Sequence, residues 1–232
     1  MPTPTRLVWL FDIDGTLLLT EGAAREAFAF AVGERLGITD DLADIRFDGR
    51  TEPEILADIL AKHGRAFPRA EQAAFWEAVF VRMRALLVPP RGRLLRGVPE
   101  LLDTVGAETS WVPALLTGNM TEMARIKLTR FGIEDRFVFG AYGEEAKNRN
   151  ALAGVAVTRA ARYGVPPSRC VVLGDTEHDI ACARAAGARA VAVATGNCSR
   201  ETLAAHRPDL LLESLADPAS LLEFARGVAA GD

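Results

Sequence analysis

Short apolar runs of strand length recur along the chain and alternate with segments of helical periodicity. Each run is almost continuously apolar, which is typical of parallel strands buried on both faces. Pro113 lies near the beginning of one run, where a proline weakens a central-strand assignment without abolishing it. The pattern predicts an α/β fold with a parallel sheet covered by helices. The runs occupy 7–11, 111–117, 137–139, 170–173, 190–193 and 210–212, and helices are expected at 99–105, 120–130, 150–163, 179–186 and after the last run.

The segment 18–92 differs, because its apolar positions follow helical spacing only. Helices are predicted at 21–36, 52–61 and 69–87, and no strand is expected between Thr16 and the break at 89–92. The first apolar run must therefore join the later strands, since the insert has no sheet to receive it. The sequence predicts an all-helical cap domain at 18–92, inserted into a core domain made of 1–17 and 93–232. Hinges at 17–20 and 88–92 would let the cap move.

Length and composition narrow the class of protein. With 232 residues, 49% of them hydrophobic, the chain can bury the core of one large domain or of a domain with an insert. A net charge of −4 gives no support for a nucleic-acid partner. Neither a signal peptide nor a membrane span is expected. Cys170, Cys182 and Cys198 lack metal-site spacing, so free thiols in a cytoplasmic protein are predicted.

Candidate chemistry lies directly after the apolar runs, at the strand ends where ligands collect in open α/β sheets. Paired carboxylates repel each other unless a cation or substrate offsets their charge. A hydroxyl and an amide at the head of a helix can donate hydrogen bonds to an anion. A strand ending in an Asp-Gly turn is the structural alternative for the first stretch. In chain order the stretches are Asp12-Ile13-Asp14-Gly15-Thr16, Thr117-Gly118-Asn119, a polar segment with Lys147 and Arg149, and Gly174-Asp175 with Asp179.

These four stretches, in this order, resemble the four motifs of the haloacid dehalogenase superfamily. They are most similar to its phosphatase branch of the phosphoglycolate phosphatase type. The motifs span Asp12 to Asp179, and the sheet pattern around them agrees over nearly the whole chain. The resemblance implies a Rossmann-like core with a helical cap. It also implies a Mg²⁺-dependent phosphatase that hydrolyses a small phosphorylated metabolite through a phosphoaspartate.

The resemblance implies roles for individual residues as well. Asp12 would attack phosphorus, while Asp14 would protonate the leaving alcohol and then deprotonate the hydrolytic water. Mg²⁺ would be held by Asp12, the backbone carbonyl of Asp14 and Asp175, with Asp179 orienting the metal shell or the third-motif cation. Thr117 would hold a phosphoryl oxygen. Further candidate substrate contacts in the core are Thr16, Gly118 and Asn119.

The third motif departs from the family pattern, which usually has a lysine that is often followed by proline. Arg149 lies closer than Lys147 to the family's spacing, so Arg149 is favoured as the cation that stabilises the phosphoryl oxygens. In the cap, Asp48-Gly49-Arg50-Thr51 lies at a break between helices, and such loops in the family recognise the leaving group. Arg50 is therefore a candidate for binding a second anionic group, with an exposed loop arginine as the alternative.

Three rival functions share part of this pattern. A dehalogenase of the same family lacks the second acid of the Asp12-x-Asp14 pair. A sugar-phosphate mutase similar to β-phosphoglucomutase shares every core motif and differs in the cap and in the fate of the phosphoryl group. A non-catalytic phosphate-binding or regulatory protein would gain nothing from clustering Asp12, Asp14 and Asp175. A phosphatase is the function that the sequence favours.

Overall fold

The core of the protein is a six-stranded parallel sheet, seen in a computed structural model that describes residues 6–66 and 69–231. The strand order is β5-β4-β1-β6-β7-β8, so the predicted α/β fold class is confirmed. The strands are β1 (Leu7–Phe11), β4 (Trp111–Leu116), β5 (Phe139–Ala141), β6 (Cys170–Gly174), β7 (Arg189–Val193) and β8 (Leu210–Leu212). The helices around them are α4 (Val98–Ala107), α5 (Thr121–Arg130), α6 (Arg149–Ala160), α7 (Glu177–Ala185), α8 (Arg200–Ala205) and α9 (Ala219–Ala230).

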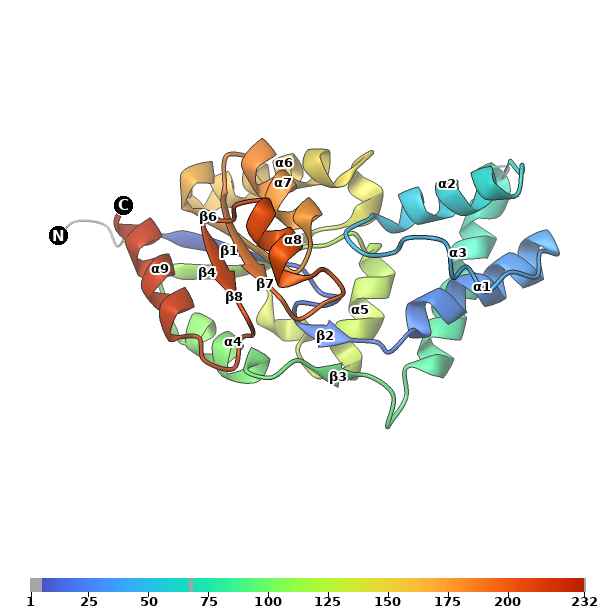
Figure 1. The fold of residues 1–232 in the computed structure, drawn as a ribbon, viewed down its shortest axis with the longest axis horizontal. Helices are drawn as coiled ribbons and strands as arrows, with labels where there is room; N and C mark the ends of the chain where they lie inside the picture. The colour runs from blue at the N-terminus through green and yellow to red at the C-terminus, as the bar shows by residue number, and fades with distance from the viewer. Residues whose placement is uncertain (1–5, 67–68, 232) are drawn as a thin grey trace.

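The first strand lies in the interior of the sheet because its side chains are buried on both faces. Leu7, Trp9 and Phe11 pack with α4 and α9, whereas Val8 and Leu10 pack with α6 and α7. Figure 1 shows these two helix pairs on opposite sides of the strands. The Trp9 and Phe11 rings are stacked with their centroids 5.7 Å apart. An apolar strand without alternation is thus a strand that contacts helices on both sides.

The strand β4 keeps a proline in the interior of the sheet. Pro113 is paired in register with Trp9 of β1, and its carbonyl accepts a hydrogen bond from the Val138 amide at 2.9 Å. The nitrogen and the carbonyl of one strand residue point to the same side, so the missing N–H of Pro113 faces β5. The ladder between β4 and β5 begins only at Ala114. The proline therefore costs no ladder hydrogen bond.

Three helices form a separate apolar cluster beyond the carboxyl ends of the strands. They are α1 (Ala23–Leu36), α2 (Glu52–Lys62) and α3 (Arg69–Leu86), which lie together on one side of the molecule in Figure 1. Phe28 of α1 and Phe75 of α3 are fully buried in this cluster, with their rings edge to face. Met123 and Ile126 of α5 belong to the same cluster. The cap helices therefore pack on a helix of the core.

The chain crosses between core and cap twice, and two short strands pair at the crossings. The strands β2 (Leu18–Leu19) and β3 (Arg93–Leu94) form an antiparallel ribbon. This ribbon corrects the expectation that no strand occurs between Thr16 and the break at 89–92. Two residues are too few to produce a strand period in a sequence.

The other predicted elements begin and end within about three residues of the observed ones. The strand expected at 137–139 is β5, which begins two residues later at Phe139. The helix α8 had no counterpart in the prediction, because six residues make fewer than two turns and only Leu203 among them is buried. No helix in the described ranges has the length and apolarity required to cross a membrane.

Candidate active site

The carboxyl ends of three adjacent strands bring the predicted motifs together. Asp12 directly follows β1, Thr117 directly follows β4, and Asp175 directly follows β6. All three side chains are buried. Asp12, Asp14, Asp175 and Arg149 line one cavity of about 440 Å³, whose wall is completed by residues of both the cap and the core. The sheet order therefore places the first, second and fourth motifs side by side, as the strand-end argument predicted.

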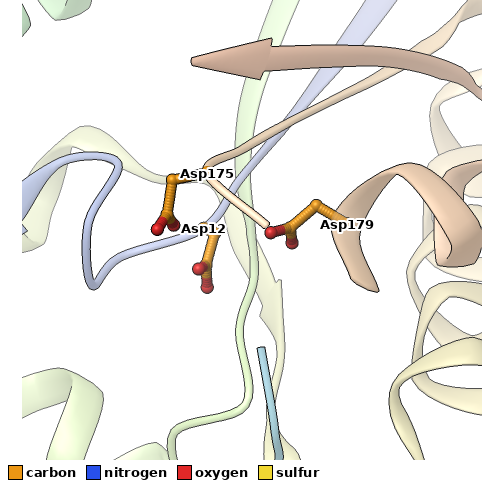
Figure 2. A group of neighbouring side chains, drawn as sticks. All are labelled: Asp12, Asp175 and Asp179. Carbon is orange, nitrogen blue, oxygen red and sulfur yellow. The ribbon is translucent and has the colours of Figure 1, made fainter. Parts of the chain in front are cut away.

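Three carboxylates converge at the base of this cavity. In Figure 2 the Asp12 and Asp175 carboxylates lie near each other and the Asp179 carboxylate points toward them, and one ligand oxygen from each lies within 4.8 Å of the others. Burial raises the pKa of Asp12 to about 6, although Arg149 opposes the shift. Burial also raises the pKa of Asp175 well above its usual range, and the charges of Asp179 and Asp12 add to that rise. Three buried carboxylates repel one another, and a cation would offset that repulsion. Their oxygen atoms are the ligands that a hard divalent ion prefers.

Both carboxylate oxygens of Asp179 have partners within the protein. Its Oδ2 accepts hydrogen bonds from the Thr176 amide at 3.0 Å and the Thr176 hydroxyl at 2.7 Å, which completes the capping box of α7. Its Oδ1 pairs with Arg149. Gly174 permits this approach, since a Cβ there would lie 2.1 Å from the Asp179 carboxyl carbon. Asp179 thus holds Arg149 in place from the start of a helix.

Arg149 is the third-motif cation that the structure brings into the cavity. Its side chain is buried, its Nη2 lies 3.1 Å from Asp12 Oδ1, and its buried Nε has no hydrogen-bond partner among the described residues. Lys147 is exposed and does not line the cavity. The geometry favours Arg149 over Lys147, in line with the spacing argument.

Asp14 is held by two donors from the second motif and the helix that follows it. Its carboxylate accepts hydrogen bonds from Lys127 Nζ at 2.6 and 2.8 Å and from Asn119 Nδ2 at 2.8 Å. The Asn119 amide also donates to Thr117 Oγ1 at 2.7 Å. Asp14 has a side chain 42% exposed, whereas Lys127 is almost fully buried. The predicted acid/base residue therefore faces the cavity from a fixed position.

Lys127 was not predicted as a site residue. It lies on α5, four positions after Met123 and three after Ala124, both of which are buried. A charged residue at a core position of a helix is a signal that periodicity could have supplied. Its partner Asp14 is 113 positions away in the chain, so the contact between them produces no local sequence pattern.

Gly15 and Thr16 form the turn after β1, and both contact Asp175 of the candidate site. Gly15 has a φ of 78°, and a Cβ there would lie 2.3 Å from Asp175 Oδ2. The Thr16 hydroxyl donates to Asp175 Oδ1 at 3.2 Å. An Asp-Gly turn is therefore present, and it brings the loop after β1 against the fourth motif. Thr16 does not line the cavity but orients one of the acids that do.

The cap reaches the site through the loop before α2 and the first turn of that helix. The Glu52 amide donates to the Gly118 carbonyl at 2.8 Å, and Glu52 Oε2 accepts from the Met120 amide at 2.8 Å. Burial raises the pKa of Glu52 to about 8, partly offset by Lys127. The sequence did not identify Glu52 as a site residue, because an acid in the first turn of a helix is common. Arg50 lines the same wall, with its Nη2 2.9 Å from Asp58.

The arrangement supplies the parts of a nucleophilic substitution at an anionic centre. A buried carboxylate, Asp12, lies beside a guanidinium, and a second carboxylate two residues later is fixed at the cavity surface. Carboxylates act as nucleophiles when their environment is preorganised, and a nearby cation stabilises charge that develops on transferred oxygens. The cavity can therefore accept a phosphate ester with its phosphoryl group at the acidic base.

Two family models match the chain. The model described as haloacid dehalogenase-like hydrolase matches residues 9–184, and a second, HAD-hydrolase-like model matches residues 152–218. The first match includes every core motif discussed above.

Curated relatives and solved structures extend the likeness to most of the chain. A phosphoglycolate phosphatase of Xylella fastidiosa is 30% identical over 83% of this chain and 82% of its own length. A fructose-1-phosphate phosphatase of Escherichia coli is 30% identical over 79% of this chain and 94% of its own. The structure of CbbY from Rhodobacter sphaeroides in complex with phosphate superposes with a TM-score of 0.74 at 22% identity, covering 92% of this chain and 96% of that one.

Proposed function

The chain belongs to the haloacid dehalogenase-like hydrolases, and from that premise we propose that it is a Mg²⁺-dependent phosphatase acting through a phosphoaspartate on Asp12. It is a phosphoric monoester hydrolase of the phosphoglycolate phosphatase-like branch. One observation carries the proposal: Asp12 lies in the cavity beside Arg149 and Asp175, with Asp14 fixed two residues later. Its substrate is a small phosphorylated metabolite.

In the first step, Asp12 attacks phosphorus and the bond from phosphorus to the leaving oxygen breaks. Asp14 gives that oxygen a proton, so the alcohol departs neutral. Arg149, which lines the cavity, and the Thr117 hydroxyl hold the phosphoryl oxygens as charge redistributes among them. Asn119 and Gly118 complete the anion-binding turn at the end of β4. The product of this step is a phosphoryl group bound covalently to Asp12.

In the second step, water attacks the phosphorus of the phosphoaspartate and inorganic phosphate leaves. Asp14 now accepts the proton that the water loses, and Asp12 departs as a carboxylate. The position of Asp14 supports both roles, since its exposed carboxylate is held by Lys127 and Asn119. The cap excludes bulk water from the cavity while the phosphoryl group is transferred.

The three buried acids fit a divalent cation by number, chemistry and spacing. Asp12, Asp175 and the backbone carbonyl of Asp14 would hold Mg²⁺, with Asp179 fixing Arg149 or joining the metal shell. When bound, the ion supplies positive charge that offsets the repulsion between carboxylates and phosphate. The pairing of Asp179 with Thr176 and Arg149 supports the first of its two roles.

A phosphate-release assay over sugar phosphates, phosphoglycolate, nucleotides and pyrophosphate, with Mg²⁺ or with EDTA, tests the function. We expect release with Mg²⁺ and its loss in EDTA. Asp12→Asn should lower kcat by about a thousandfold or more and abolish acid-stable labelling of the enzyme by phosphate. Asp135→Asn, an exposed acid far from the cavity, serves as the matched control. Full activity of Asp12→Asn would contradict the proposal, and an isomerised product in place of free phosphate would favour a mutase.

A further inference from the structure

The cavity wall that the cap contributes carries one guanidinium without an acidic partner. Arg25 of α1 lines the cavity, and across residues 6–66 and 69–231 it forms no ion pair. The other cations of the lining differ from it in this respect. Each of them is paired with a carboxylate: Arg149 with Asp12, Lys127 with Asp14, Arg93 with Glu21 and Arg50 with Asp58.

Arg25 is nevertheless fixed in place by the loop between α1 and α2. Its Nη1 donates to the carbonyl of Leu42 and, at 2.9 Å, to that of Ile45. Its guanidinium carbon lies over the Phe47 ring, 4.6 Å from the centroid. Its Nε and Nη2 make no hydrogen bond to any residue that the structure describes. The side chain is therefore preorganised, with charge and donors unused.

None of the acids on the same wall that the structure describes forms an ion pair with Arg25, and each has another partner. Asp48 accepts hydrogen bonds from the Asn197 amide at 3.1 and 3.2 Å. Glu52 accepts one from the Met120 amide, and Glu21 pairs with Arg93. A fixed guanidinium with two free donor groups matches the planar oxygens of a carboxylate or the oxygens of a phosphate. A neutral hydroxyl would leave its charge uncompensated.

We propose, building on the phosphatase function above, that Arg25 and Phe47 form a second anion site in the cavity that binds a carboxylate or a second phosphate on the leaving group. The transferred phosphoryl group occupies the acidic base of the cavity, and the second anion contacts the cap. The substrate is then a small phosphate ester with two anionic groups. Arg50, the loop arginine favoured by the sequence, is less suited to this contact because Asp58 already holds it.

Matched substrate pairs test this selectivity directly. The pairs are 2-phosphoglycolate against 2-hydroxyethyl phosphate, and fructose 1,6-bisphosphate against fructose 1-phosphate. For wild type, we expect kcat/KM to be higher for the member with a second anionic group in at least one pair, and the pair that shows it identifies the anion as carboxylate or phosphate. Arg25→Gln, which keeps hydrogen-bond donors for the two carbonyls, should lower that kcat/KM about tenfold or more and leave unchanged the value for the ester with an uncharged leaving group.

Two further variants separate recognition from folding. Arg25→Lys keeps the charge and should restore part of the preference, whereas Arg93→Gln, a paired arginine on the same wall, should keep all of it. Equal losses for both members of each pair, or a wild-type preference for the esters with an uncharged leaving group, would overturn the anion site. If no ester releases phosphate, the phosphatase function fails separately. Binding of 3-phosphonopropionate, a non-hydrolysable compound with a phosphonate and a carboxylate, by wild type and by Arg25→Gln then decides the matter, with equal affinities counting against the site.

Discussion

At the scale of single residues, Lys127 shows how a buried charge can be stable in a helix core. A buried ammonium is costly unless its donors are satisfied, and Lys127 donates to both oxygens of Asp14 and to Asn119 Oδ1 at 2.5 Å. The same contacts fix the orientation of the Asp14 carboxylate, to which we assign proton transfer. The stability of the helix and the aim of the acid/base residue therefore depend on one side chain.

Replacing Lys127 by methionine should separate these two effects. Methionine preserves the volume, so we expect the protein to fold, while Asp14 loses its strongest partner. For an alkyl phosphate, kcat should fall about 100-fold, the lower end of what general acid–base catalysis contributes. For p-nitrophenyl phosphate, whose leaving group needs no proton, the fall should be smaller. Lys62→Met, in the cap, is the control, and an equal fall on both substrates would refute a role in aiming Asp14.

Glu52 makes stability depend on pH. Its pKa is raised to about 8 by burial, so the folded protein holds this proton more tightly than the unfolded chain does. Its contribution to stability is therefore fully present below about pH 4.5 and is lost as pH rises through about 8. Glu52→Gln should flatten that decline, with a gain of a few kcal/mol, about 2 to 4, at pH 9. Urea unfolding at pH 5, 7 and 9 measures the free energy of unfolding of each variant, and Glu77→Gln, at an exposed position, is the control. If this free energy changes with pH in the same way for Glu52→Gln and wild type, the account is wrong.

At the scale of elements, the contact between the second motif and the start of α2 depends on missing side chains. A Cβ on Gly118 would lie 2.1 Å from the Arg50 carbonyl oxygen, a backbone atom that cannot rotate away. The Thr51 side chain caps α2 by accepting a hydrogen bond from the Glu54 amide. The Thr51 amide in turn donates a hydrogen bond to Glu54 Oε2 at 3.0 Å. The capping box thus fixes the end of the helix that contacts Gly118.

Gly118→Ala should move this loop off the core without unfolding the core. We expect KM to rise and kcat to fall, about tenfold in kcat/KM, because the cap can no longer close on the second motif. Gly154→Ala, within α6 and free of neighbours at its Cβ, should instead stabilise the protein by about 0.5 to 1 kcal/mol. Steady-state kinetics and thermal unfolding of both variants check this. Unchanged kinetics for Gly118→Ala would show that the contact is dispensable.

The sequence predicted elements well where burial is continuous and poorly where contacts are distant. The strand β1 lies where its apolar run placed it, because a strand that is buried on both faces has no polar position along its length. The ribbon of β2 and β3 and the short helix α8 were missed, since two or six residues carry no usable period. Lys127 and Glu52 were missed because their roles arise from partners far along the chain.

At the scale of the whole molecule, the cap is joined to the core at several separate places. Arg46 of the cap pairs with Glu177 of α7 at 2.6 Å, and Asp48 is bonded to Asn197. The ribbon of β2 and β3 ties the two crossings together. Asp48 also lines the cavity that Asp12 and Asp175 line. Any ligand that offsets the charge of the acidic cluster at the base of this cavity should therefore stabilise core and cap together.

Mg²⁺ should accordingly raise the unfolding temperature of the intact protein. A ligand at about 100 times its Kd adds about 2.7 kcal/mol, which corresponds to about 5 to 11 °C for a chain of this size. Because burial raises the pKa of Asp12 to about 6, protons should compete with the metal and remove most of the shift at pH 5. Thermal unfolding in Mg²⁺ and in EDTA at pH 8 and pH 5 measures both effects. Asp175→Asn should lose the Mg²⁺-dependent rise in unfolding temperature, because Asp175 belongs to the acidic cluster. Asp135→Asn should keep the rise, because Asp135 does not belong to the cluster. A shift of equal size in both variants would place the ion elsewhere on the protein.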